Sequence, residues 1–112
     1  MDRTRIHQVI EKLRESDYQV RRGYPVDKIP YLTTPVIAVC LGKILPEGMT
    51  LKLHIFCPLK LGGETCEDTA MSVMEALSAL GGRLSADACS FHESMGLFTQ
   101  TVEVEFTEGS KA

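Results

Sequence analysis

The chain has 112 residues, of which 44% are hydrophobic and 24% charged. This length and composition suit one domain with a single apolar core, and they exclude a chain that is disordered throughout. The formal net charge of −3 disfavours a nucleic-acid binder, because such domains concentrate positive charge on a phosphate-facing surface. We therefore predict one domain over residues 1–112 that binds no nucleic acid.

No apolar run follows the charged residues at the start, and no segment approaches the length that spans a membrane. These features predict a cytoplasmic protein without a membrane partner, in which disulfides are not expected. The cysteines are far apart in sequence and lack a C-x-x-C pair, so a zinc site is not expected either. Cys40 and Cys57 lie in apolar strand contexts and are predicted to be core residues.

An amphipathic helix is predicted from Thr4 to Tyr18, with Thr4 as a candidate N-cap. Its apolar residues recur at helical spacing. They are Ile6, Val9, Ile10 and Leu13. This stripe suits packing on the sheet or on another subunit, and packing within the chain is favoured. A short strand is expected at Gln19–Gly23.

A long irregular connection is expected from Tyr24 to Thr34, because Pro25 and Pro30 remove backbone donors and restrict the residues before them. Loops of this length inside a compact domain are often functional. The segment is either a surface connector or a contact arm with Tyr24 and Tyr31 as anchors, and the residues do not decide between the two.

Two strands follow and are expected to form an antiparallel hairpin. Pro35–Lys43 is a continuous apolar run rich in β-branched residues, which is typical of a central strand covered on both faces. Residues 46–48 supply the turn, and Met49–Cys57 alternates apolar and polar residues. Pro58 ends this strand, because proline cannot donate to the ladder.

A second helix is predicted from Thr65 to Leu80, with Thr65 as the N-cap and Asp68 completing a weak capping box. Gly81 and Gly82 end it, because glycine tolerates the left-handed conformation of a helix C-terminus. The predicted apolar face comprises Ala70, Val73, Met74, Leu77 and Leu80.

A second hairpin completes the predicted fold. Its first strand, Arg83–Cys89, is weaker, with Leu84, Ala86 and Ala88 on one face. Its second strand alternates clearly, and residues 107–112 are expected to form a flexible polar tail. The predicted buried row is Phe98, Gln100, Val102, Val104 and Phe106.

The predicted order of elements is α-β-β-α-β-β. This order favours an α+β two-layer sandwich, in which a mainly antiparallel sheet of about four strands carries two helices on one face.

The search for reactive groups gives one candidate. Cys89, His92 and Glu93 lie close in sequence and resemble a nucleophile, a base and an orienting group. Such a triple is common by chance, and no known catalytic or phosphate-binding motif is present. His7 and His54 fall on predicted polar faces. We therefore expect no enzyme, no cofactor and no metal site. The alternative is a small-ligand-binding or catalytic domain that uses the Cys89/His92 loop.

Several loose motifs carry a family resemblance over roughly residues 6–106. After the first helix come a Tyr24-Pro25 loop and an apolar strand that is preceded by a proline. Next come a Cys57-Pro58 step and the sequence "GGETC" (62–66) at the start of the second helix. The last motif is a final strand that ends at Phe106. Together they resemble the small tail-completion proteins of tailed bacteriophages and prophages, the tail-terminator group.

This resemblance implies an α+β structural protein that assembles as a ring, commonly a hexamer, on the end of the tail tube. It implies copies of itself, the tail-tube protein and head-connector proteins as partners, and a location in the bacterial cytoplasm and then in the virion. A closed ring needs two different patches that meet head to tail. The candidate interface residues are Arg21, Arg22, Tyr24, Tyr31, Glu103 and Glu105, with the arginines matched to the glutamates.

Overall fold

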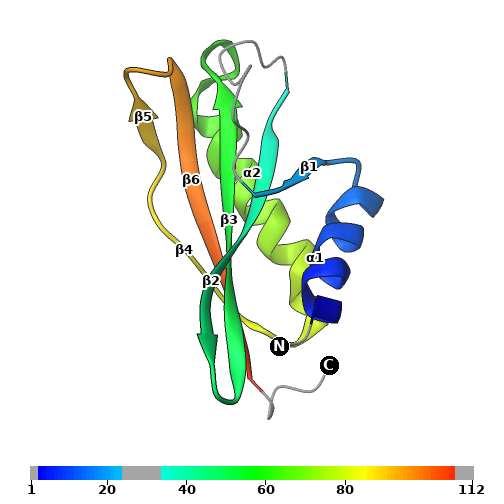
Figure 1. Ribbon diagram of the computed structural model, residues 1–112. Coiled ribbons are helices and arrows are strands. Elements are labelled where there is room, and N and C mark those ends of the chain that lie inside the picture. Colours follow the sequence, from blue (N-terminus) through cyan, green and yellow to red (C-terminus); the bar gives the residue numbers. More distant parts are fainter. Residues whose placement is uncertain (1–2, 24–33, 108–112) are drawn as a thin grey trace.

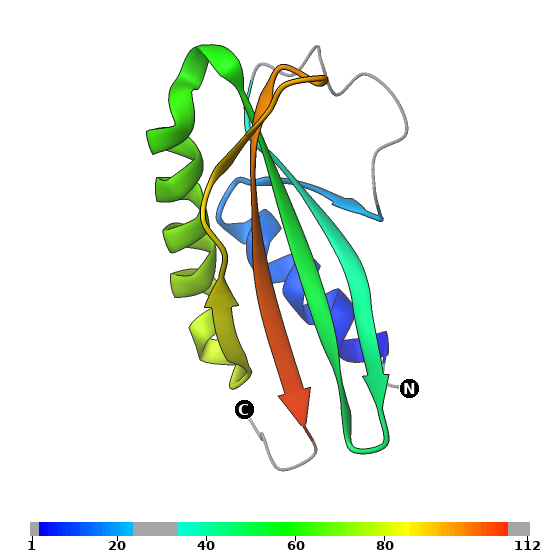
Figure 2. The same cartoon turned by 90° about the vertical axis from the view of Figure 1, so that its left-hand side faces the viewer.

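The computed structural model describes residues 3–23 and 34–107. In chain order its elements are α1 (Arg3–Glu15), β1 (Gln19–Arg22), β2 (Val36–Leu45), β3 (Gly48–Pro58), α2 (Gly62–Leu77), β4 (Arg83–Ala86), β5 (Ser90–His92) and β6 (Leu97–Thr107). Short 3-10 turns, η2 (Leu59–Leu61) and η3 (Ser78–Leu80), flank α2. Both helices lie on the same face of the sheet (Figures 1 and 2).

The strands of the described residues form one six-stranded sheet in the spatial order β1-β2-β3-β6-β4, with β5 also paired to β6. The mixed α+β class is confirmed, but the expected number of about four strands and the order α-β-β-α-β-β are wrong. The short strand β1 joins the sheet by parallel pairing with β2. A further short strand, β5, forms in the expected connector and pairs with β6.

The core lies between the helices and the inward-facing rows of β2, β3 and β6. The apolar stripe predicted on α1 is buried in this core together with Ala70, Val73 and Leu77 of α2, so α1 packs within its own chain. Arg5 adds a polar link, because its Nη1 donates to the carbonyl of Leu80 at 3.2 Å and its guanidinium lies 4.6 Å from the Phe106 ring centroid. Sequence periodicity predicted this arrangement well.

β2 is an interior strand, as expected, with β1 on one side and β3 on the other. Residues 36–39 are buried on both faces, because Ala38 points away from the helices into a small second cluster with Phe56 and Leu97. Beyond this point β2 is less buried, and residues 42–44 are exposed in succession. Cys57 is fully buried as predicted, whereas Cys40 is only half-buried.

The first helix ends at Glu15, three residues before the predicted end. The amide of Tyr18 donates to the carbonyl of Leu13 at 3.2 Å, and that of Asp17 donates to Arg14 at 3.0 Å. Asp17 has a φ of 66°, so this is a Schellman motif with an aspartate in the left-handed position where glycine is usual.

The predicted cap of the second helix is wrong. The helix α2 begins at Gly62, and the Thr65 hydroxyl donates to the carbonyl of Leu61 at 2.7 Å from inside the helix. Gly62 has a φ of 82° and a ψ of 163°, a conformation open mainly to glycine, and this lets the chain enter the helix early. At the other end Gly81 takes the left-handed conformation as expected.

The second hairpin differs from its prediction along its first strand. β4 ends at Ala86 instead of the predicted Cys89, and of the predicted row Leu84 packs against the core, whereas Ala86 and Ala88 are exposed. β6 extends to Thr107, one residue into the predicted tail. The predicted irregular segment falls largely outside the described residues. Within residues 3–23 and 34–107, no helix has the length and apolar character needed to cross a membrane.

The left-handed residue that ends α1 gives a stability prediction. Asp17→Gly removes the steric cost of a side chain at positive φ and should stabilise the fold by about 0.5–1 kcal/mol. Urea denaturation measures the change. Ser16→Gly is the matched control, because Ser16 does not have a positive φ and glycine there should destabilise the protein. Equal shifts in both variants would contradict the assignment.

Candidate functional site

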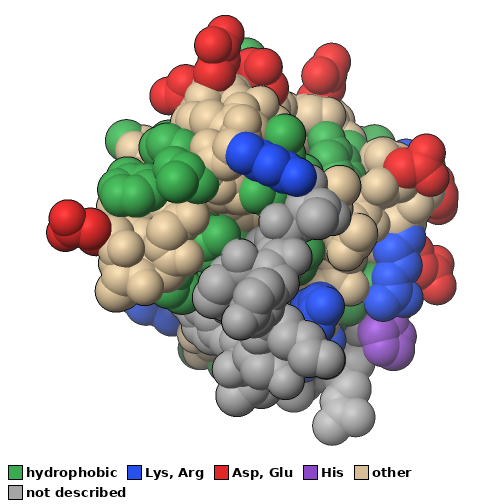
Figure 3. Space-filling view, turned by 90° about the horizontal axis from the view of Figure 1, so that it is seen from above, with side chains coloured by type: hydrophobic (Ala, Val, Ile, Leu, Met, Phe, Trp, Pro, Cys, Tyr) green, Lys and Arg blue, Asp and Glu red, His purple; other side chains and the backbone are tan. Residues whose placement is uncertain are grey.

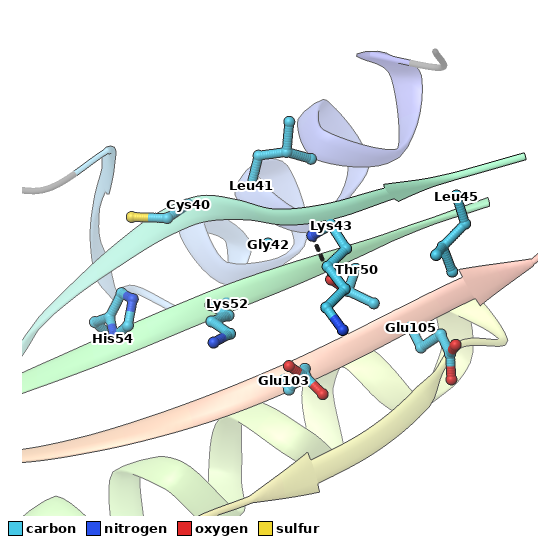
Figure 4. Close-up of a pocket in the computed structure, with 10 residues that line it drawn as sticks. All are labelled: Cys40, Leu41, Gly42, Lys43, Leu45, Thr50, Lys52, His54, Glu103 and Glu105. Atoms are coloured by element: carbon cyan, nitrogen blue, oxygen red, sulfur yellow. Dashed lines mark hydrogen bonds between the residues drawn. The ribbon is translucent and has the colours of Figure 1, made fainter.

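The candidate site lies on the face of the sheet that the helices leave open. Alternate side chains of β2, β3 and β6 project from this face and line a pocket of about 670 Å³ (Figure 4). The lining combines two lysines, two glutamates and a histidine with a cysteine, a threonine, a glycine and two leucines. The polar lining residues are Cys40, Lys43, Thr50, Lys52, His54, Glu103 and Glu105.

Strand register brings these charges together. Lys52 of β3 lies directly opposite Glu103 of β6, and Thr50 lies opposite Glu105. In Figure 4 the side chains of Lys43 and Lys52 approach Glu103 over the middle of the pocket. Opposite charges on facing strands attract one another and contribute modestly to sheet pairing. The pocket therefore presents both signs of charge and suits a polar partner surface.

A bulge in β2 shapes one side of the pocket. The pairing between β2 and β3 shifts between Leu41 and Ile44. The Lys43 amide then donates to the Thr50 side-chain oxygen at 2.7 Å instead of to the ladder. Glycine is needed beside this contact, because a Cβ on Gly42 would come within 2.5 Å of the same oxygen. The bulge turns this end of β2 and exposes Lys43.

His54 of β3 is a titratable group of the pocket whose pKa is shifted by its surroundings. Its Nδ1 lies 3.1 Å from the Thr101 hydroxyl, within hydrogen-bonding distance. Burial lowers the pKa of His54, the positive charge of Lys52 lowers it further, and Asp87 acts in the opposite direction. The folded protein thus favours the neutral imidazole.

Asp87 bridges the break between β4 and β5. Its amide donates to the Thr101 carbonyl at 3.1 Å, and its Oδ1 accepts from the Thr101 amide at 2.8 Å. Its own carbonyl accepts from Nε2 of Gln100 at 2.7 Å. This bond explains why one polar residue stands in the buried row of β6, although Gln100 Oε1 is buried without a hydrogen bond in the described structure.

The predicted interface residues divide into separate groups. Arg21 and Arg22 are exposed on β1, which forms one edge of the sheet. Glu103 and Glu105 are half-buried on β6, on the open face. The structure thus places the two charge groups on different strands, with β2 and β3 between them. Tyr24 and Tyr31 lie outside the described residues.

The candidate nucleophile and base do not meet. The half-buried Cys89 packs against the core on the helix side, with its sulfur beside Gly63 of α2. His92 is exposed, with its Nδ1 3.2 Å from the Ser94 hydroxyl, and Glu93 is exposed in the following turn. The structure therefore does not assemble the predicted triple. Within the described ranges, no group of three or more His, Cys, Asp or Glu side chains could hold a metal ion.

One end of the molecule carries exposed apolar side chains. Leu59 and Leu61 of η2 are 55% and 37% exposed, and Phe91 of β5 is 49% exposed. Figure 3 views this end and shows apolar patches bordered by acidic side chains. The Phe91 ring packs at a tilt against the Phe98 ring, with 5.3 Å between the ring centroids. Apolar surface rimmed by charge is typical of a contact surface.

No protein-family model matches the chain, and no curated protein matches it at a significant level.

The sequence did not predict the pocket, although the polar residues that line it are visible in the alternation of each strand. Thr50, Lys52 and His54 were assigned to a polar strand face, and Glu103 and Glu105 to another. Their meeting depends on the register of β3 against β6, which joins strands separated by the whole of α2. Periodicity determines which face a residue occupies, but it does not determine the partner across a long connection.

The charge environment of His54 gives a titration prediction. Lys52→Gln removes a repulsive positive charge and should raise the pKa of His54, as followed by NMR of the imidazole ring. Lys60→Gln on the exposed turn η2 is the matched control and should leave that pKa unchanged. A similar shift in both variants would mean that Lys52 has no special influence.

The same histidine predicts how stability depends on pH. Because its folded pKa lies below the unfolded value, its neutral form favours folding above about pH 6.5, and this contribution is lost as the pH falls. His54→Gln should therefore flatten the decline in urea midpoint between about pH 7.5 and about pH 5.5. An unchanged slope would show that other groups govern it.

Proposed function

We propose that this chain is a structural tail-completion protein of a phage or prophage. It assembles as a ring at the end of the tail tube, stops tube growth and provides the surface for head joining. The proposal extends the family resemblance of the sequence, in which the helices and the open sheet correspond to the two layers of an α+β sandwich. Copies of the chain, the tail-tube protein and head-connector proteins are its partners, in the bacterial cytoplasm and then in the virion.

The separation of opposite charges across the sheet carries the proposal. Arg21 and Arg22 lie on the edge strand β1, and Glu103 and Glu105 lie on β6, three strand positions away. At a spacing of about 4.8 Å per strand this is roughly 14 Å, beyond the reach of a direct ion pair. The arginines and these glutamates therefore cannot pair with each other inside one chain, and two different complementary patches are what a head-to-tail ring requires.

The surfaces around these charges also support a ring-forming protein. The α1 stripe is used inside the chain, so the sheet edges, the open face and the apolar end remain for partners. The edge strand β1 has only four residues, which limits indiscriminate strand pairing. The apolar end with Leu59, Leu61 and Phe91 suits contact along the tail axis, whereas the charged patches suit contact around the ring.

Charge reversal tests the ring. Arg21→Glu with Arg22→Glu should weaken self-association by about tenfold or more, because like charges then face each other across the interface. Glu103→Lys with Glu105→Lys should have the same effect, and the combined variant should regain part of the affinity. Sedimentation velocity over a wide concentration range measures the association.

Lys12→Glu is the control, because Lys12 lies on α1, outside both charge groups and the apolar end, and should not change assembly. Circular dichroism confirms that each variant is folded. A wild-type chain that stays monomeric at high concentration and low salt, and that does not bind tail tubes, would contradict the proposal. If the arginine reversal alone and the glutamate reversal alone both assemble as the wild type does, the predicted charge match is wrong.

A further inference from the structure

Three thiols from distant parts of the chain converge on the first turns of α2. They belong to Cys57 near the end of β3, Cys66 in α2 and Cys89 between β4 and β5. The Cys57 thiol donates to the Gly62 carbonyl at 3.8 Å, and a Cβ built on Gly63 would lie 3.6 Å from the Cys89 sulfur. Cys66 follows Gly63 by three residues in α2, so it lies on the same face of the helix, the face that Cys89 covers.

The members of this cluster differ in access. Cys57 and Cys66 are fully buried, whereas Cys89 is half-buried and lies beside the exposed β5 edge. Burial, followed by the neighbouring Cys89, raises the pKa of both buried thiols. Cys89 is therefore the thiol that a reagent reaches first, and the buried thiols react only after it.

We propose that Cys66 and Cys89 form a reversible disulfide that ties α2 to the connection between β4 and β5. Cys66 is the partner because it lies one helical turn beyond Gly63 on the face of α2 that Cys89 covers, whereas Cys57 donates its hydrogen bond to a backbone carbonyl. In a reducing compartment the pair stays as two thiols, as in the described structure, and in an oxidising one it closes. This proposal is independent of the ring.

A small disulfide such as oxidised glutathione is the oxidant. The Cys89 thiolate attacks one of its sulfurs, forms a mixed disulfide and releases one glutathione thiolate. That thiolate takes the proton of Cys66, and the Cys66 sulfur attacks Cys89 Sγ and releases the second glutathione thiolate. Two protein thiols are oxidised and one small disulfide is reduced to two thiols, so atoms and electrons balance.

The bond would stabilise a part of the fold that has few polar constraints. No side-chain cap holds the start of α2, and β5 has only three residues. Closing the loop from Cys66 to Cys89 restricts the unfolded chain and should lower the equilibrium constant of unfolding by about two orders of magnitude.

Peptide mapping of the full chain tests the assignment without any variant. Each cysteine falls on a different tryptic peptide: Cys40 on 29–43, Cys57 on 53–60, Cys66 on 61–83 and Cys89 on 84–111. After incubation with oxidised glutathione and alkylation of free thiols, we expect one linked pair, 61–83 with 84–111. Dithiothreitol should restore both free peptides.

Two variants make the test specific. Cys57→Ala should retain the link, and Cys66→Ala should instead accumulate glutathione on Cys89, because the resolving thiol is gone. A link between 53–60 and 84–111 in the wild type would overturn the pairing. A persistent mixed disulfide, or four unreacted thiols under conditions that oxidise dithiothreitol, would overturn the proposal itself.

Discussion

The antiparallel pairing of β3 with β6 is the constraint on which the rest of the molecule depends. It joins the two halves of the chain in a continuous ladder from Gly48 opposite Thr107 to Pro58 opposite Leu97. This register fixes both faces at once, because alternate residues fill the core beneath the helices and line the open face. A slip of one residue would bury the pocket charges and expose the core row, so the hydrophobic pattern holds the register strongly.

The two edges of the sheet, on either side of this central pair of strands, differ from each other. On one side lie β2 and then the short parallel strand β1, whose arginines are exposed, and on the other β4 and β5 share the outer edge of β6 across the Asp87 bridge. The helices cover one face, and the other carries the charged pocket beside a small apolar cluster. Such asymmetry suits a protein that meets copies of itself through different surfaces, which is the physical basis of the proposed ring.

The sequence predicted what local periodicity controls and missed what long-range packing controls. The α1 stripe, the β2–β3 hairpin, the row of β6 and the left-handed Gly81 were all visible in residue spacing. Thr65 was misread as a cap because Gly62 takes a conformation open mainly to glycine and lets α2 begin earlier. The parallel partner of β1 and the meeting of the three thiols depend on tertiary contacts, for which spacing carries no signal.

The position of β3 has a consequence for how the fold opens. Its amides are flanked by β2 on one side and β6 on the other, whereas β1, β4 and β5 each have a single neighbouring strand in the described sheet. In a hydrogen-exchange experiment, the backbone amides of the short outer strands should therefore exchange first and those in the middle of β3 last. In the proposed assembly, a second chain would meet these outer strands while the central strands stay intact.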